Sequence, residues 1–270
     1  MHLIRNRILF FGAALMAGLG SMWLHRTMMT ACIDENGLLI SGSLPEILLW
    51  GLGITFLVFL LAFLQTIGGD GSYAGNFPRS IFHGCLMIAA GIILLFSIPE
   101  LDLGDSAPLP AVNGLSLLIQ QATSAAMVYL PWAAAACMAA LGVYRILGKR
   151  PWSILCGIIC LFYTLMLVTN YRLWSANPAL HRYAYQLLSL VLLMLCAFHR
   201  TCCDAGIIQR KKLLATGFSA AACAMAALSM DFQWCFFLAS AVWALGSIGT
   251  VAVLPPDSEN EEPEQTENHE

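Results

Sequence analysis

Long apolar runs alternate with short polar stretches along almost the whole chain. Eight runs of about 20 residues stand out, and an α-helix needs roughly 20 apolar residues to cross the hydrocarbon core of a bilayer. The pattern therefore predicts an all-α fold, a polytopic transmembrane helix bundle of about eight spans. We expect the spans at residues 8–25, 46–67, 80–98, 125–147, 152–171, 183–203, 213–230 and 234–254.

Composition agrees with a bilayer as the solvent. Hydrophobic residues make up 59% of the 270 residues and charged residues only 11%, and the mean hydropathy is +0.75. A soluble domain carries about 25% charged residues, so this chain cannot cover a water-facing surface. We expect one transmembrane helical domain, residues 1–254, in the cytoplasmic membrane.

Lysine and arginine indicate the direction of the spans, because the side of the membrane that keeps these residues is normally cytoplasmic. With the N-terminus inside, ten of the thirteen basic residues fall in inner segments, and both termini are cytoplasmic. The inner residues are Arg5, Arg7, Arg79, Arg145, Lys149, Arg150, Arg200, Arg210, Lys211 and Lys212, and the outer ones are Arg26, Arg172 and Arg182.

The C-terminal segment 255–270 differs from the rest of the chain. Residues 257–270 hold seven of the sixteen acidic residues and no basic residue. This leaves thirteen basic residues against nine acidic ones in the remainder. A segment with so much charge and so few apolar side chains cannot build a core, so we expect a disordered acidic tail.

Two segments allow more than one interpretation. The first apolar run follows Arg5 and Arg7 like a secretory signal, but residues 8–24 exceed the usual apolar region of roughly 7–15 residues, which favours a retained span. Residues 113–124 are too short to cross a bilayer, and we expect an interfacial helix there. The alternative is one long tilted helix that continues to Leu147, with a bend near Pro131.

Catalytic and metal-binding patterns are missing from the sequence. No acidic or basic residue lies in the middle of an expected span, which argues against a proton pump or a mid-membrane site for a charged substrate. HExxH and GxSxG motifs do not occur, and the ten cysteines form no CxxC pair. The segment His199–Asp204 carries nitrogen, sulfur and oxygen donors, but further metal ligands cannot be named. We predict no enzyme, no metal and no cofactor.

Small residues recur at every fourth position in two expected spans. Ala13, Ala17 and Ser21 form one such row, and a second row contains Ala215, Ser219, Cys223 and Ala227. Rows of this kind let helix backbones approach closely in lipid. The span 213–230 is therefore expected to lie centrally or at a tight helix contact.

The best candidate for a ligand site is the stretch YRLWSANPALHRYAYQ, residues 171–186, between the fifth and sixth spans. Aromatic residues there are typical of helix anchors at the lipid headgroups. Arg172 and Arg182 are not explained in this way, because they lie on the outer side, where the other loops are acidic. We predict an outward-facing ligand-binding cleft lined by Arg172, Trp174, Arg182, Tyr185 and Gln186, with Gln186 at its floor.

Three short stretches resemble a family. They are DENGLL at 34–39, YAGNFPRS at 73–80, and YRLW with a following Asn-Pro at 171–178. Together they resemble a group of uncharacterised multi-spanning membrane proteins of Gram-positive anaerobic bacteria. The resemblance implies a bacterial cytoplasmic membrane protein and carries no activity with it.

These observations favour a non-enzymatic membrane component that senses a ligand or binds a partner. A permease or channel for a small uncharged or hydrophobic solute is the alternative, and a lipid-modifying enzyme using outer-loop carboxylates is a third hypothesis. The expected partners are the lipid bilayer, other membrane proteins and an unidentified small-molecule ligand, and no nucleic acid.

Overall fold

The computed structural model describes residues 2–32, 40, 42–65, 67, 73–101, 114–175, 183–229 and 233–248. These residues form helices and no strand. The elements are α1 (His2–Ala31), α2 (Leu44–Gln65), α3 (Tyr73–Asn76), α4 (Ile81–Ser97), η1 (Ile98–Glu100), α5 (Gly114–Leu147), α6 (Ser153–Ser175), α7 (Ala184–Ala205), α8 (Arg210–Ala227) and α9 (Trp234–Ile248). The acidic tail lies outside the described residues.

Each of the eight expected spans overlaps one long helix, so the all-α prediction holds for the described residues. Four helical segments are long and apolar enough to cross a membrane: Leu44–Gln65, Val128–Leu147, Ser153–Tyr171 and Ala184–Ala205. Two further apolar helices, α4 and α9, are shorter. The other two expected spans, α1 and α8, include arginine or lysine residues near their starts, which lowers the mean hydropathy of each helix.

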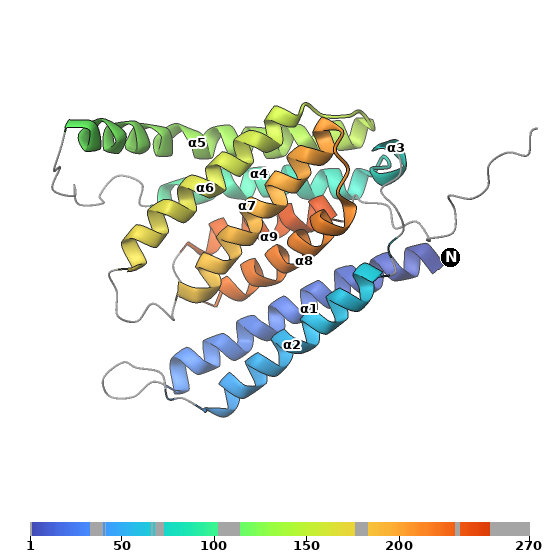
Figure 1. Ribbon diagram of the computed structural model, residues 1–270, viewed down its shortest axis with the longest axis vertical. Coiled ribbons are helices and arrows are strands. Elements are labelled where there is room, and N and C mark those ends of the chain that lie inside the picture. The colour runs from blue at the N-terminus through green and yellow to red at the C-terminus, as the bar shows by residue number, and fades with distance from the viewer. Residues whose placement is uncertain are drawn as a thin grey trace, which may run out of the picture.

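Six helices close into a ring. Each helix from α4 to α9 packs against the next one in the chain, and α9 returns to pack against α4. Helices α1 and α2 form a hairpin that contacts the ring mainly through α8. Figure 1 shows α4 and α5 along one edge of the molecule and the α1–α2 hairpin along the opposite edge.

Large aromatic side chains fill the middle of the ring. Tyr163 of α6 and Trp243 of α9 are both 0% exposed, and their ring centroids lie 5.7 Å apart. The rings of Phe162 and Phe236 meet edge to face, with centroids 5.9 Å apart. Tyr163 also donates a hydrogen bond to Oγ of Ser240 at 3.2 Å. The described core is therefore packed with side chains from opposite sides of the ring.

The prediction that the span 213–230 lies at a tight contact is confirmed. Helix α8 packs against α1, α7 and α9. A Cβ atom added to Gly217 would collide with Ile248 of α9, and one added to Gly18 of α1 would lie 2.5 Å from Cε of Met225 of α8. Helices α4 and α5 approach equally closely, because a Cβ atom on Gly142 would lie 2.5 Å from the backbone oxygen of Gly84.

The interfacial helix expected at residues 113–124 is wrong. Helix α5 is continuous from Gly114 to Leu147, with Pro131 inside it, which is the long-helix alternative. The sequence between Gly114 and Pro131 has no further glycine or proline to end the helix. A proline within a membrane helix is tolerated where the surrounding protein satisfies the freed backbone groups.

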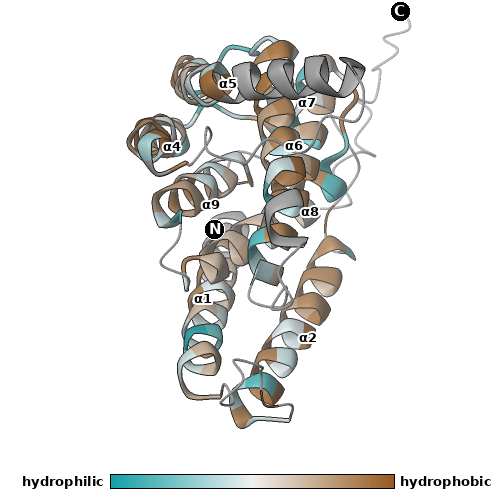
Figure 2. Ribbon diagram, turned by 90° about the vertical axis from the view of Figure 1, so that its left-hand side faces the viewer, coloured by the Kyte–Doolittle hydropathy of each residue, from teal (hydrophilic) through white to brown (hydrophobic). Residues whose placement is uncertain are grey.

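Among the side chains that the structure describes, those of helix α2 form the most extensive apolar surface. Trp50 is 69% exposed, Ile54 60% and Val58 61%, and most of this helix is coloured as hydrophobic in Figure 2. Soluble monomers rarely expose a contiguous apolar patch of such extent. The surface of α2 suits contact with lipid.

Candidate functional site

The structure describes only part of the predicted cleft. Tyr185 and Gln186 lie in the first turn of α7, and Arg172 and Trp174 lie in the last turn of α6. The side chains of Arg172 and Trp174, and the whole of Arg182, lie outside the described residues. Convergence of all five predicted residues therefore stays a prediction, and the geometry below concerns Tyr185 and Gln186.

Tyr185 connects α7 with the α1–α2 hairpin. Its ring meets the imidazole of His25 edge to face, with centroids 4.9 Å apart and ring planes at 74°. His25 is 1% exposed, and its Nδ1 shares a hydrogen bond of 2.5 Å with Oγ of Ser229, just after α8. We call His25, Tyr185, Gln186 and Ser229 the outer polar cluster, after the side of the membrane on which the sequence analysis expects the start of α7. Three helices, α1, α7 and α8, contribute to it.

Gln186 is the most unusual member of this cluster. Its side chain is 0% exposed, and neither Oε1 nor Nε2 has a hydrogen-bond partner among the described residues. Leaving a buried polar group unsatisfied costs about 1–3 kcal/mol. A buried amide with both a free donor and a free acceptor is therefore a group that a bound polar molecule would satisfy.

The side chains of the outer polar cluster are an imidazole, a phenol, an amide and a hydroxyl. All can donate or accept hydrogen bonds without a fixed charge. In α6, Asn170 is likewise buried, with a side-chain nitrogen that lacks a partner in the described part of the chain. The chemistry of these groups suits recognition of a small, uncharged, polar molecule.

A second polar group lies at the opposite end of α7, around the carboxylate of Asp204. Its Oδ2 accepts hydrogen bonds from Nε of Arg200 at 3.2 Å and from Sγ of Cys156 at 3.4 Å. The other oxygen, Oδ1, accepts a hydrogen bond from the hydroxyl of Tyr73 at 3.0 Å. Arg200 and Asp204 are 1% and 3% exposed. This buried ion pair links α3, α6 and α7.

Two aromatic rings extend this network to further arginines. The guanidinium carbons of Arg145 and Arg200 lie 4.8 Å and 4.2 Å from the centroid of the Phe77 ring. Arg150 lies 5.2 Å from the centroid of the Tyr73 ring. Such cation–π contacts contribute about 0.5–2 kcal/mol each when they are shielded from water. The segment 73–80 thus docks between the ends of α5 and α7.

Burial has a measurable consequence for Tyr73. It raises the pKa of the Tyr73 phenol to about 12, although the nearby positive charge of Arg200 acts in the opposite direction. The phenol therefore keeps its proton at physiological pH and remains a hydrogen-bond donor to Asp204.

Sequence reasoning did not identify the Asp204 network. Arg200 and Asp204 are four residues apart on one helix, and this spacing places them on the same face. The spacing was a usable signal for the ion pair. Nothing in the sequence indicated that Tyr73 and Cys156, 131 and 48 residues away from Asp204, would complete it.

Comparison of the chain with protein-family models, with curated proteins and with solved structures finds no match.

Proposed function

We propose that this chain is a multi-pass protein of the cytoplasmic membrane that senses a small polar ligand from the outside. The ligand binds at the outer polar cluster, where the α1–α2 hairpin meets the ring of helices. The observation that carries the proposal is the buried side-chain amide of Gln186, which has no described hydrogen-bond partner and directly follows Tyr185, the residue whose ring contacts His25. Arg172, Trp174 and Arg182 are proposed to complete the site.

The proposed orientation has eight spans with both termini in the cytoplasm. Contacts around Asp204 bring the segment before α4, the connection between α5 and α6 and the end of α7 to one end of the bundle. These segments are among the expected inner segments, which together carry ten of the thirteen basic residues. The end of α1, the start of α7 and the segment after α8 meet at the other end. The positive-inside trend then makes the Asp204 end cytoplasmic.

A sensing role is supported by how the hairpin is attached. The hairpin packs on the ring mainly through α8, and the outer polar cluster lies across this junction. If the hairpin can adopt a second arrangement on the ring, a ligand that contacts both sides of the junction would favour the arrangement that it binds more tightly and would shift the populations of the two. The exposed α2 then offers a changed surface to lipid or to a membrane partner.

A permease or channel is the second hypothesis. A solute path through the ring would run where Tyr163, Phe236 and Trp243 pack, and these side chains are fully buried. This packing is why we favour sensing over transport.

Chemical labelling tests whether position 186 can be reached from outside. We expect a cysteine in Gln186→Cys to react, in intact cells, with a small membrane-impermeant methanethiosulfonate, read by mass spectrometry of the peptide. Two control variants give the limits of the labelling rate. Ala184→Cys, at an exposed position in the same turn, should react fastest, and Ser189→Cys, at a buried position one turn further along α7, should react slowest. The proposal predicts an intermediate rate for Gln186→Cys. A rate equal to that of Ser189→Cys would show that the cluster is sealed and would overturn the ligand site.

A further inference from the structure

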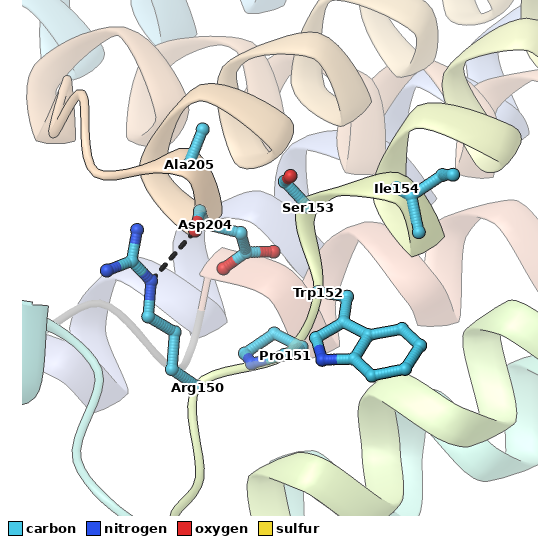
Figure 3. A pocket seen from close by; sticks show the side chains of 7 residues that line it. All are labelled: Arg150, Pro151, Trp152, Ser153, Ile154, Asp204 and Ala205. Carbon is cyan, nitrogen blue, oxygen red and sulfur yellow. Dashed lines mark hydrogen bonds between the residues drawn. The ribbon is translucent and has the colours of Figure 1, made fainter.

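A pocket opens at the Asp204 end of the bundle, between the start of α6 and the end of α7. Its volume is about 520 Å³, and it is lined by residues 150–154 on one side and by Asp204 and Ala205 on the other. Figure 3 shows the Arg150 side chain extending toward Asp204, while Trp152 points to a different side. We propose that this pocket binds the phosphate group of an anionic phospholipid.

Charge at this end of the bundle is strongly unbalanced. The side chains that the structure describes there include Arg79, Arg145, Lys149, Arg150, Arg200, Arg210, Lys211 and Lys212, against one carboxylate, that of Asp204. This carboxylate is already engaged by Arg200, Tyr73 and Cys156. It is therefore not available to neutralise the charge at the pocket, and an anion is the complementary ligand.

Arg150 is the residue that places positive charge at the pocket. Its Nε donates a hydrogen bond of 2.8 Å to the backbone oxygen of Asp204, which holds the side chain in place. An arginine whose guanidinium is fixed in this way is suited to phosphate, because its N–H groups match the spacing of phosphate oxygens. Ser153, at the start of α6, adds a hydroxyl to the lining.

The rim of the pocket distinguishes a phospholipid from free phosphate. Trp152 is 71% exposed and Ile154 63% exposed, and both belong to the lining. An exposed tryptophan beside a cationic residue is typical of the membrane interface, where an aromatic ring lies at the level of the headgroups. The apolar rim offers contact to acyl chains, which inorganic phosphate lacks.

Thermal unfolding of the purified protein in a neutral detergent tests the inference. Each variant is measured alone and with added phosphatidylglycerol, phosphatidylcholine or inorganic phosphate, and the change in its own midpoint is compared. A ligand that binds only the folded state raises the midpoint. We expect phosphatidylglycerol to raise the midpoint of the wild type clearly more than the other two additives do.

Three variants distinguish binding at this pocket from general electrostatic attraction of the anionic lipid to the basic end of the bundle. Arg150→Gln and Trp152→Ala should each lose most of the shift caused by phosphatidylglycerol. The matched control Lys211→Gln, which removes an exposed charge at the same end outside the pocket lining, should keep the shift. Trp152→Ala provides a second reading if Arg150→Gln fails to fold, because Trp152 is largely exposed.

Two results would overturn the inference. One is an equal loss of the shift in Lys211→Gln and Arg150→Gln, which would show diffuse electrostatic attraction. The other is an equal shift with inorganic phosphate and with phosphatidylglycerol, which would identify free phosphate as the ligand. The inference concerns the end of the bundle opposite the outer polar cluster, so labelling at position 186 and lipid binding can fail independently.

Discussion

At the scale of single residues, Asp204 and Gln186, at the two ends of α7, are both buried but differ in their hydrogen bonds. Asp204 is surrounded by donors, so its charge is compensated by Arg200, Tyr73 and Cys156. Gln186 is equally buried, but its side-chain amide has no partner among the described residues. A satisfied network holds helices together, whereas an unsatisfied amide is available for a ligand. This contrast is why we assign a structural role to Asp204 and a binding role to Gln186.

The raised pKa of Tyr73 predicts a change of stability at alkaline pH. The pKa of the phenol rises from its ordinary value of 10.0 to about 12 in the folded protein. Between pH 10 and pH 12, the folded state therefore retains a phenol proton that the unfolded state has lost. The contribution of this phenol to the free energy of unfolding is complete below pH 10 and is lost as the pH rises toward 12.

Unfolding of wild type and Tyr73→Phe measured across this range should separate the two proteins. At neutral pH we expect Tyr73→Phe to be less stable by about 1.5–3 kcal/mol, the typical loss of one hydrogen bond to a charged group. The difference should shrink as the pH increases from 10 to 12. A constant difference over this range would mean that the pKa of the Tyr73 phenol is not raised in the folded protein.

At the scale of helices, the apolar runs predicted the helices well because a lipid solvent requires long apolar segments whose backbone hydrogen bonds close within the helix. The boundaries were less accurate. Helix α1 begins and ends beyond the expected residues 8–25, and α5 continues through the segment taken for an interfacial helix. Hydropathy marks where lipid contacts a helix, not where the backbone stops being helical. The polar residues Gln120 and Gln121 did not end α5.

Small residues predicted a contact but not its partner. The row in α8 indicated close approach, yet only the structure shows α1, α7 and α9 around it. The approach of α4 and α5 through Gly84 and Gly142 was not predicted, since isolated glycines form no visible row in the sequence.

The contact between α4 and α5 supports a prediction about Gly142→Ala. The added methyl group would lie 2.5 Å from the backbone oxygen of Gly84, and a backbone cannot move aside like a flexible side chain. Overpacking of this kind costs about 1–3 kcal/mol. Gly157→Ala in α6 is the matched control, because nothing lies within 4 Å of its added Cβ.

Chemical or thermal unfolding in detergent measures both variants. Gly142→Ala should unfold more easily than the wild type, and Gly157→Ala should be unchanged or slightly more stable, because alanine favours the helix over glycine. Equal stability of the two variants would show that α4 and α5 are not in backbone contact.

At the scale of the whole molecule, hydropathy predicted the all-helical fold of the described residues, whereas the sequence indicated only two members of the outer polar cluster. Tyr185 and Gln186 were predicted because they lie in an unusual polar stretch, and their role in ligand binding stays a prediction. His25 and Ser229 were missed, since they are 204 residues apart in the sequence and meet only when α1 packs on α8. A single sequence contains no signal for such a long-range pairing. The same limit applies to Tyr73 and Asp204.

The orientation of the bundle can be tested with two native cysteines. Cys32 follows α1 and Cys202 lies near the end of α7, and both are partly exposed. The contacts of His25 and Asp204 put these residues at opposite ends of the bundle. Ten basic residues in the segments assigned to the Asp204 end are the basis for proposing that this end is cytoplasmic. A membrane-impermeant maleimide should therefore modify Cys32 in intact cells and Cys202 only after the cells are opened. Because the readout is the mass of each peptide, the other eight cysteines can remain in place.

Modification of Cys202, but not of Cys32, in intact cells would reverse the orientation. It would also move the proposed ligand site to the cytoplasm and the phospholipid site to the outer leaflet.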